Sequence, residues 1–136
     1  MAGTFLDSNI VLYVASADPA KADIAEMALR RGGIASVQVL NEVAHVCRRK
    51  LGFGFVETET FLEMVRELVQ VVPLDIETHK LGLAVAARHR LSVWDGMIAA
   101  AALRAGCDQL FSEDLHPGLV IDGRLRVANP FAALRG

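Results

Sequence analysis

The amino-acid sequence predicts an α/β domain built on a central, mostly parallel β-sheet. Short apolar runs alternate with longer stretches of helical periodicity along the 136-residue chain, which is the pattern of repeated strand–helix units. No repeat, low-complexity tract or linker divides the chain, so we expect one domain covering residues 1–136. With 53% hydrophobic and 22% charged residues, the chain has the composition of a folded domain with its own core.

The expected elements follow one another in a simple order. We expect strands at residues 4–6, 34–36, 71–74, 109–112 and 125–127. We expect a first helix that begins near Asn9. Further helices are expected at residues 21–31, 37–51, 57–69, 76–89 and 93–105. Gly32 and Gly33 should stop the second helix, and Pro73 indicates the end of its strand or an edge position in the sheet.

The charge balance excludes one class of protein. The chain has 14 Lys and Arg residues against 16 Asp and Glu residues, a formal net charge of −2, so it is not a strongly basic nucleic-acid binder. Local basic clusters remain, although solvated helix ends explain such clusters equally well. They are Arg48-Arg49-Lys50, Arg88-His89-Arg90 and Arg30-Arg31. A mean hydropathy of +0.36 is high for a small domain and indicates apolar surface for a partner chain.

The sequence contains no signal for export or membrane insertion. Asp7 interrupts the first apolar stretch and no basic segment precedes it, unlike in a signal peptide. The longest apolar run, residues 97–103, is too short to cross a bilayer. Cys47 and Cys107 form no C-x-x-C pair and are expected to be small core residues in a reducing compartment. We therefore expect a cytoplasmic protein that does not associate with a membrane.

Two acidic residues follow predicted strands. Asp7 comes after the first strand and Asp114 after the strand at 109–112, and the ligand crevice of a parallel sheet lies at these carboxyl ends. A carboxylate beside an apolar strand loses solvation unless it is paired or bound to a metal. The simpler interpretation is an N-cap or Asx turn formed by Asp7, Ser8 or Asn9, and a polar loop around Asp114. Each residue alone is compatible with both interpretations.

Glu42 is predicted to lie on the polar side of the helix at 37–51. The apolar side of that helix should hold Val37, Val39, Leu40, Val43, Ala44, Val46, Cys47 and Leu51, and the polar side Gln38, Asn41, Glu42, His45, Arg48 and Arg49. An ordinary solvated glutamate fits this position. The functional alternative is a carboxylate one turn above the crevice that Asp7 faces.

Asp95 stands at the start of the alanine-rich helix. The sequence Ser92-Val93-Trp94-Asp95 has the pattern of a capping box, in which the Asp95 carboxylate accepts a hydrogen bond from the Ser92 amide. The helix dipole also favours an acid at this position. A helix start beside the ends of strands is, however, also a place where a metal or phosphate site can form.

Taken together, these segments resemble the PIN-domain ribonucleases, and specifically the VapC-type toxins of bacterial toxin–antitoxin modules. The resemblance is carried by FLDSN at residues 5–9, SVQVLNE at 36–42, WDGMIAAA at 94–101 and LFSEDL at 110–115. The tail at 118–131, which ends in Asn-Pro-Phe, resembles one subgroup of these toxins. The resemblance covers nearly the whole chain and implies a three-layer PIN-like domain, with a central sheet flanked by helices.

The resemblance further implies one metal-binding acidic cluster formed by Asp7, Glu42, Asp95 and Asp114. Such a cluster would use Mg²⁺, or Mn²⁺ as a substitute, to hydrolyse RNA phosphodiesters, because hard divalent cations activate water and neutralise phosphate charge. We expect Asp7 and Asp95 to be direct ligands and Asp114 to help hold the metals. Glu42 would bind a second ion or orient water. No Lys or His is placed to be a general base, so metal-activated water is the expected nucleophile.

Short polar residues complete the expected site. Ser8, Asn9 and Ser112 are candidates for hydrogen bonds to the metal ligands or to the phosphate. Ser112 stands where many family members have Thr, which keeps the hydroxyl. Gly96 stands where Ala is common, which predicts a looser start to its helix without loss of Asp95.

The resemblance also implies partners for the chain. They are an RNA substrate, a cognate antitoxin protein and a second copy of the chain in a homodimer. Contact with RNA should come from Arg49, which shares a helix side with Glu42, and from the neighbouring Arg48 and Lys50.

Two other functions remain open from the sequence. A phosphatase of the haloacid-dehalogenase type also has an acid after its first strand, but it normally needs a second aspartate two residues later, where this chain has Asn9. A non-catalytic PIN-like interaction module is the other alternative. The four acids of the expected cluster are all present, which argues against an inactive module.

Overall fold

A computed structural model describes residues 3–135 and contains a six-stranded sheet with the strand order β3-β2-β1-β4-β6-β5. The strands are β1 (Thr4–Leu6), β2 (Ile34–Ser36), β3 (Gln70–Val72), β4 (Gln109–Phe111), β5 (Val120–Ile121) and β6 (Leu125–Ala128). All neighbouring pairs are parallel except β5 and β6. The predicted mostly parallel sheet is therefore confirmed.

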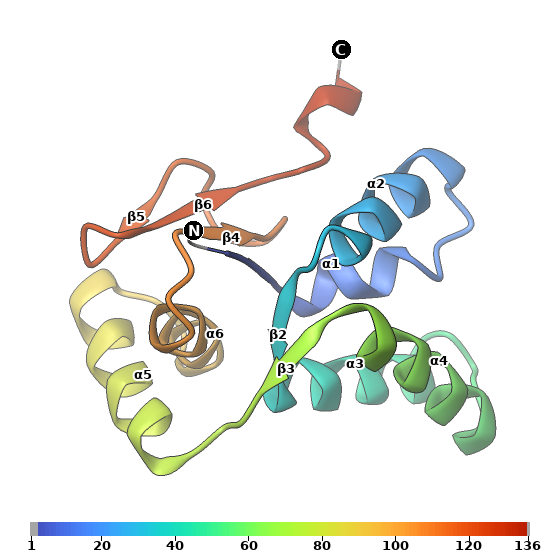
Figure 1. Cartoon of the computed structure of the whole chain (residues 1–136), viewed down its shortest axis with the longest axis horizontal. Helices are drawn as coiled ribbons and strands as arrows, with labels where there is room; N and C mark the ends of the chain where they lie inside the picture. Colours follow the sequence, from blue (N-terminus) through green and yellow to red (C-terminus); the bar gives the residue numbers. More distant parts are fainter. Residues whose placement is uncertain (1–2, 136) are drawn as a thin grey trace.

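Helices cover both faces of this sheet (Figure 1), so the expected three-layer α/β architecture is also confirmed. The helices are α1 (Ser8–Tyr13), α2 (Pro19–Arg30), α3 (Val37–Arg49), α4 (Phe55–Leu68), α5 (Ile76–His89) and α6 (Val93–Arg104), and a 3₁₀ turn follows at Ala132–Arg135. Helices α5 and α6 lie on one side, and α1 to α4 lie on the other. No helix among residues 3–135 is long and apolar enough to cross a membrane.

Polar residues cap the start of five helices. The side chains of Asp7, Asp18, Ser36, Asp75 and Ser92 each accept a hydrogen bond from a backbone N–H in the first turn of α1, α2, α3, α5 and α6, respectively. Such caps satisfy amide groups that have no partner inside the helix. Because β1 and β2 run directly into α1 and α3, the capping residues Asp7 and Ser36 lie at the carboxyl ends of these two strands.

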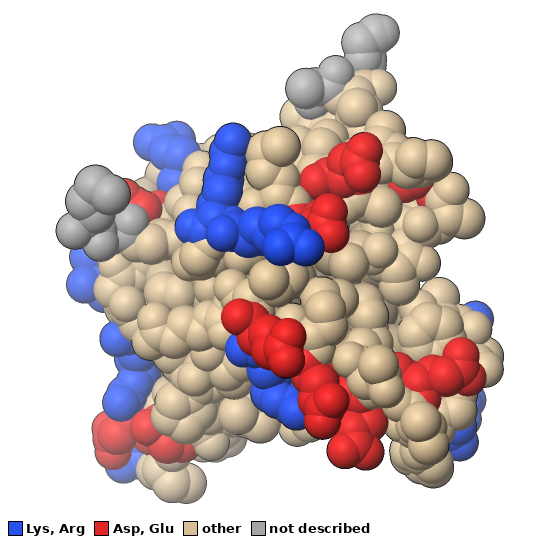
Figure 2. Space-filling model, turned by 45° about the vertical axis from the view of Figure 1, so that its right-hand side comes forward, with Lys and Arg blue, Asp and Glu red and all other residues tan. Residues whose placement is uncertain are grey.

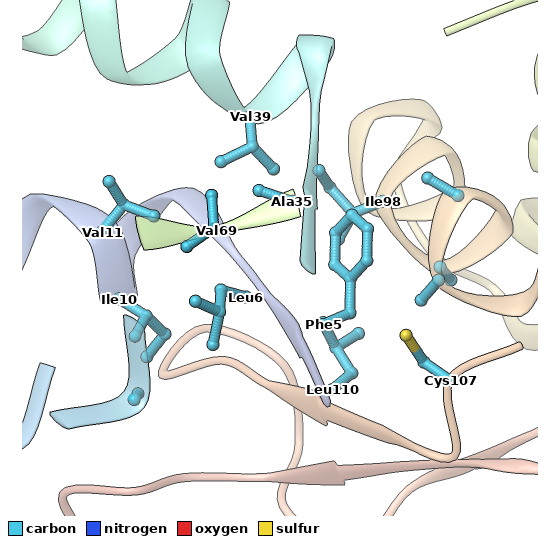
Figure 3. Close-up of a cluster of buried hydrophobic side chains, with 14 of the residues drawn as sticks. Phe5, Leu6, Ile10, Val11, Ala35, Val39, Val69, Ile98, Cys107 and Leu110 are labelled. Carbon is cyan, nitrogen blue, oxygen red and sulfur yellow. The ribbon is translucent and has the colours of Figure 1, made fainter. Parts of the chain in front are cut away.

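Adjacent residues of the central strand β1 contribute to the core on both sides of the sheet. Phe5 and Leu6 of β1 are fully buried and project to opposite sides of the strand, Phe5 toward Ile98 of α6 and Leu6 toward Ile10 of α1 (Figure 3). This alternation follows from the two-residue period of a strand and explains how one short strand anchors both helical layers. The two cysteines are buried and free, as predicted.

The predicted elements agree with the observed ones to within one or two residues at each end. The strand β5 is the exception, because it was not predicted. It forms an antiparallel hairpin with β6 through Asp122 and Gly123, whose φ angles are 52° and 69°. Two consecutive positive φ values are typical of the tight type I′ turn, and Asp-Gly is a preferred sequence for it. That dipeptide was the available signal for the missing strand.

The predicted sides of α3 were wrong at its first turn. Val37 is 40% exposed, whereas Gln38 is only 7% exposed and donates a hydrogen bond from Nε2 to the backbone oxygen of Trp94 at 3.3 Å. The helix starts immediately at the end of β2, so its first turn is oriented by the strand and by α6. Helical periodicity does not contain this information.

Helices α5 and α6 approach each other through a pair of glycines. A Cβ atom added to Gly96 would lie 2.5 Å from the backbone oxygen of Gly82 and 2.8 Å from the Cβ atom of Ala86. A Cβ atom on Gly82 would lie 2.5 Å from Sδ of Met97. Gly96 therefore allows close contact with α5 in the turn that carries Asp95, a role that the sequence analysis did not anticipate.

Candidate functional site: an acidic cluster at the carboxyl ends of the strands

The pairing of β1 with β4 brings the first and last predicted acids together. Leu6 lies opposite Phe111 in the parallel ladder, and the amide of Asp7 donates to the backbone oxygen of Phe111 at 3.0 Å. The segment Ser112–Asp114 therefore leaves the sheet beside Asp7. The sequence placed both acids at carboxyl ends of strands, and the strand order makes those ends neighbours.

Asp7 is almost completely buried, with an exposed fraction of 4%. Its Oδ1 accepts a hydrogen bond from the backbone N–H of Ser8 at 2.7 Å, and its Oδ2 accepts one from the Ser112 hydroxyl at 2.7 Å. The Asn9 amide nitrogen lies 3.4 Å from the same Oδ2. Asp7 is thus the N-cap of α1, as the simpler interpretation predicted, and its carboxylate is also fixed by the side chains of Ser112 and Asn9.

Asn9 and Ser112 connect Asp7 to the exposed Asp114. The Asn9 amide nitrogen donates to Oδ2 of Asp114 at 3.0 Å, and Oδ1 of Asn9 accepts from the amide of Glu113 at 3.2 Å. The Ser112 hydroxyl also accepts from the backbone amide of Asp114 at 3.2 Å. Two of the three residues expected to make supporting hydrogen bonds, Asn9 and Ser112, therefore hold the loop after β4 against the start of α1.

Glu42 and Asp95 reach the same region from α3 and α6. Glu42 is half-buried rather than fully solvated, and Ser8 and Gln38 lie within hydrogen-bonding reach of its carboxylate. The Ser92 hydroxyl accepts from the amide of Asp95 at 3.1 Å. The capping box is only half formed, because no bond from the Ser92 amide to Asp95 is found among residues 3–135. The Asp95 carboxylate interacts with the side chain of Ser92 and is repelled by the charge of Asp114.

Burial and mutual repulsion raise the pKa values of three of these acids. Burial is the largest cause for the raised pKa of Asp7, Glu42 and Asp95 alike. The charges of Asp95 and Asp114 raise the pKa of Asp7 further, and those of Asp7 and Asp95 raise the pKa of Glu42. All four acids therefore form one electrostatically coupled group, whose charged form is disfavoured unless a cation is present.

The donor set of this cluster suits a hard divalent cation. Every ligand that it offers is oxygen, and Mg²⁺ prefers oxygen donors while keeping several waters and using one or two carboxylates. Among residues 3–135, no three Asp, Glu, His or Cys side chains are arranged to hold an ion together. Of the four acids, Asp7 is the one most constrained by hydrogen bonds.

The three basic residues expected to contact RNA differ in their surroundings. The Arg48 guanidinium donates to the backbone oxygen of Phe53 at 3.1 Å and stacks over the ring of Phe55 at 3.9 Å, so it also stabilises the loop before α4. Arg49 and Lys50 are exposed. Arg49 is seven residues from Glu42 on α3, or about 10 Å along the helix axis.

No continuous basic surface covers the face of the molecule shown in Figure 2. Acidic and basic side chains form small groups there, some of which touch, and uncharged residues surround them. The near-neutral charge balance of the sequence is thus also evident on this face. Binding of a polyanion there would depend on cations held by the acids or on a few individual basic side chains.

A second polar network next to the acids was missed from the sequence. The Tyr13 hydroxyl donates to Glu113, and Nζ of Lys21 lies 3.2 Å from both the Tyr13 hydroxyl and Oε2 of Glu113. The Tyr13 ring makes an edge-to-face contact with Phe131, at a centroid distance of 4.7 Å. The network joins α1, α2, the loop after β4 and the C-terminal segment. Since its members are distant in sequence, no local pattern could have revealed it.

Comparison with known proteins identifies the family. The PIN domain model matches residues 4–116, whereas a comparison with curated protein sequences found no match. A DNA-bound VapBC complex from Salmonella typhimurium has a chain with a TM-score of 0.72 and 18% identity, covering 96% of this chain and 99% of that one. A toxin–antitoxin complex from Klebsiella pneumoniae gives a TM-score of 0.70 at 18% identity, with 94% and 98% covered.

VapC20 of Mycobacterium tuberculosis, a sarcin–ricin loop cleaving toxin, also has the same fold. Its TM-score is 0.67 at 17% identity, covering 82% of this chain and 92% of that chain. At these identities the solved structures establish the fold, and the family model establishes the membership. The strand order, the acids at the carboxyl ends of β1 and β4 and the match over residues 4–116 lead to one conclusion: this chain belongs to the PIN domain family.

Proposed function

We propose that this protein is a metal-dependent endoribonuclease and the toxin of a toxin–antitoxin pair, acting in the cytoplasm. The observation that carries the proposal is the buried, hydrogen-bonded Asp7 in one electrostatically coupled group with Glu42, Asp95 and Asp114. Membership of the PIN family and the fold shared with VapC toxins support it. An acid group without a cationic partner of its own is costly to a fold, which favours a functional role over a structural one.

We infer a separate task for each residue. Asp7 and Asp95 would bind Mg²⁺ or Mn²⁺, Asp114 would help to hold it, and Glu42 would bind a second ion or orient water. A bound divalent ion would lower the pKa of water and neutralise charge on the phosphodiester. Ser112 and the Ser8 amide fix the orientation of the Asp7 carboxylate, and Asn9 keeps Asp114 beside it. The chain would thus supply oriented carboxylates that hold the ion.

An antitoxin protein is the proposed partner that controls this activity. Solved structures with the same fold include toxin–antitoxin complexes. A groove of about 500 Å³ lies between α1 and the end of α3, lined mainly by apolar side chains such as Leu12, Val46 and Leu51. Asn9, which contacts both Asp7 and Asp114, also lines it. An apolar peptide in this groove would therefore adjoin the acidic cluster. Homodimer formation is proposed on the same family grounds.

A cleavage assay with purified protein tests the proposed activity. Total RNA and defined single-stranded RNA are incubated with the protein in Mg²⁺, in Mn²⁺ or with EDTA, and the new 5′ ends are mapped. We expect internal cleavage that requires the divalent ion. Hydrolysis of a generic phosphomonoester without RNA cleavage would instead favour the phosphatase alternative, and the absence of both activities would favour the non-catalytic module.

Expression in the host tests the partner. Induced expression of this chain should arrest growth, and co-expression of the small protein encoded beside it should relieve the arrest. An arrest that the Asp7→Asn variant still causes would show that toxicity does not come from the acidic cluster. A neighbour that relieves the arrest without binding the chain would contradict its assignment as the antitoxin.

A further inference from the structure

Trp94 is exposed at the edge of the acidic cluster. It is the only tryptophan of the chain, and 66% of its surface is exposed. It lies in the first turn of α6, directly before Asp95. Tryptophan gains more from burial or stacking than most other residues because of its large aromatic surface. An exposed tryptophan beside a group of coupled carboxylates therefore indicates a surface that receives a ligand.

The backbone of Trp94 is held rigidly. Its carbonyl oxygen accepts a hydrogen bond from Gln38 at 3.3 Å, and the Gln38 side chain is itself buried. The Ser92 cap fixes the start of α6, and the close approach of Gly96 to α5 fixes the same turn from below. The indole is thus attached to a preorganised support, which reduces the entropy lost on binding.

A groove separates Trp94 from α3. It has a volume of about 490 Å³ and is lined by four polar residues and Val46 of α3, by Trp94 and, toward Asp7, by Ser8. The polar residues are Gln38, Asn41, Glu42 and His45. This size is within the range of small-ligand sites. Amide, imidazole and carboxylate groups opposite an aromatic surface can form hydrogen bonds to the edges of a base while its flat side stacks.

We propose that Trp94 is a stacking platform for one unpaired nucleotide of the RNA, next to the phosphodiester that lies at the acids. The proposal rests on the proposed function, because it assigns a residue that positions the RNA at the same site. Stacking needs a free base face, which a paired base inside a duplex does not present. Glu42 and Ser8 connect the groove to Asp7, so a base on Trp94 would place its neighbouring phosphate at the cluster.

The lining of the groove favours a nucleotide over a second copy of the chain. Five of its seven lining residues are polar or charged, and Asn41 and His45 are exposed. The core of an interface between identical chains is depleted in charged residues. Polar groups around one aromatic side chain are instead typical of a site that holds a base. Dimer formation through Trp94 becomes one outcome of the test.

Fluorescence of the single tryptophan allows a direct test. Wild-type protein is titrated with a short single-stranded RNA and with the same sequence as a duplex, in Ca²⁺, which uses the same kind of oxygen ligands as Mg²⁺. The RNA is checked for integrity after each titration. We expect quenching that saturates with the single strand and none with the duplex. Equal quenching by both would overturn the proposal.

Variants separate stacking from mere apolar contact. With labelled single-stranded RNA followed by anisotropy, Trp94→Ala should weaken binding by about 5- to 150-fold, the range of one lost stacking interaction. Trp94→Phe should retain most of the affinity, and Trp94→Leu should behave like Trp94→Ala. The matched control is Val93→Ala, which changes an exposed apolar residue of the same helical turn that does not line the groove. It should leave the affinity unchanged.

Two results would overturn the stacking role. One is Trp94→Ala protein that binds single-stranded RNA as tightly as the wild type. The other is a loss of binding in Trp94→Ala that Val93→Ala shares, together with a change from dimer to monomer in light scattering, which would assign the surface to the chain itself. Circular dichroism of each variant confirms that it is folded.

Failure of the stacking proposal can be distinguished from failure of the proposed nuclease function. Trp94-dependent binding of single-stranded RNA by a protein that never cleaves RNA would retain the platform and reject the nuclease. Metal-dependent cleavage that Trp94→Ala performs with unchanged KM and kcat would retain the nuclease and reject the platform.

Discussion

The acids at the two ends of this molecule are held in opposite ways. Asp122, in the turn between β5 and β6, receives two hydrogen bonds from Arg88, at 3.2 and 2.6 Å, and lies 2.9 Å from Nε2 of His89. These contacts lower its pKa. Asp7 has only neutral hydrogen-bond donors in Ser8, Asn9 and Ser112, and its burial raises its pKa.

The difference shows which acids serve the fold and which are available for chemistry. A carboxylate with a cationic side chain beside it is already neutralised and stabilises the folded state. Buried carboxylates that face one another are neutralised only when a cation is supplied from outside. Charge pairing in the structure thus separates two kinds of aspartate that look alike in the sequence.

The largest expected effect is on the rate of RNA cleavage, when Asp7 and Asp122 are each replaced by Asn. Asp7→Asn should reduce RNA cleavage by at least about 100-fold, since even residues that only support metal ligands contribute about 10- to 100-fold. Asp122→Asn should leave the cleavage rate within about two-fold. Among residues 3–135, the ion pairs of Asp122 are those with Arg88 and His89, which do not belong to the acidic cluster. Initial rates on a defined RNA measure both. A comparable loss in both variants would remove the distinction.

The uncharged Ser112 hydroxyl should contribute both to stability and to cleavage, because it holds the Asp7 carboxylate in place. Ser112→Ala removes the hydroxyl that donates to Asp7 and accepts from the amides of Asp114 and Leu115. Leaving buried groups without partners costs about 1 to 3 kcal/mol. We expect that loss in urea unfolding and a lower cleavage rate, whereas Ser112→Thr should restore both. If threonine fails to restore them, the hydroxyl is not the essential feature.

Divalent ions should stabilise the folded protein by binding at the acidic cluster that contains Asp7, and not at Asp122. At ten times its dissociation constant, an ion that binds only the folded state adds about 1.4 kcal/mol, which raises the Tm by a few degrees in a domain of this size. Thermal unfolding with Mn²⁺ and with EDTA measures this shift. It should shrink in Asp7→Asn and persist in Asp122→Asn. A shift that Asp7→Asn keeps in full would place the ion elsewhere.

The two ends should also respond to pH with opposite sign. The pKa of Asp122 is lowered on folding, so its stabilisation is present above the unfolded value near 4 and is lost as the pH falls through the folded pKa. The pKa of Glu42 is raised, so the free energy of unfolding decreases as the pH rises from the unfolded value through the folded pKa.

Matched variants measure these signs and give the smallest expected effects. At pH 7 in EDTA, Asp122→Asn should lower the free energy of unfolding by about 1 kcal/mol or less. Glu42→Gln should raise it by about 0.5 kcal/mol or less. The Glu42 difference should disappear near pH 3, where Glu42 is protonated in either state. The Asp122 difference should shrink only as the pH falls below the unfolded value near 4 and through the lowered folded pKa. The same sign for the two variants at pH 7 would contradict the contrast. Urea unfolding at several pH values provides the data.

Strands and helices were predictable wherever local signals agreed. Gly32 and Gly33 mark the end of α2, and β3 ends before Pro73 at the edge of the sheet. Strand β5 escaped prediction because it has only two residues, and its turn signal, Asp122-Gly123, was not used. The first turn of α3 was assigned to the wrong sides because contact with Trp94 buries Gln38, and no periodicity encodes a contact across 56 residues.

The acids of the site were identified from the sequence, but their environment was not. Strand ends and a capping pattern pointed to Asp7, Asp95 and Asp114, and parallel pairing brings the first and the last of these together. The half-burial of Glu42 depends on α3 lying against Ser8, which is a tertiary effect. Metal binding and RNA contact by Arg49 remain predictions that the experiments above address.

The glycine pair between α5 and α6 has a consequence for protein engineering. Replacing an unusual residue by the commonest one in a family is a frequent route to higher stability, and that route would suggest Gly96→Ala here. In this chain the new methyl group would meet the carbonyl of Gly82 and the side chain of Ala86. Positions 82 and 96 therefore form a coupled pair, and a consensus design that treats them independently would shift the turn that carries Asp95.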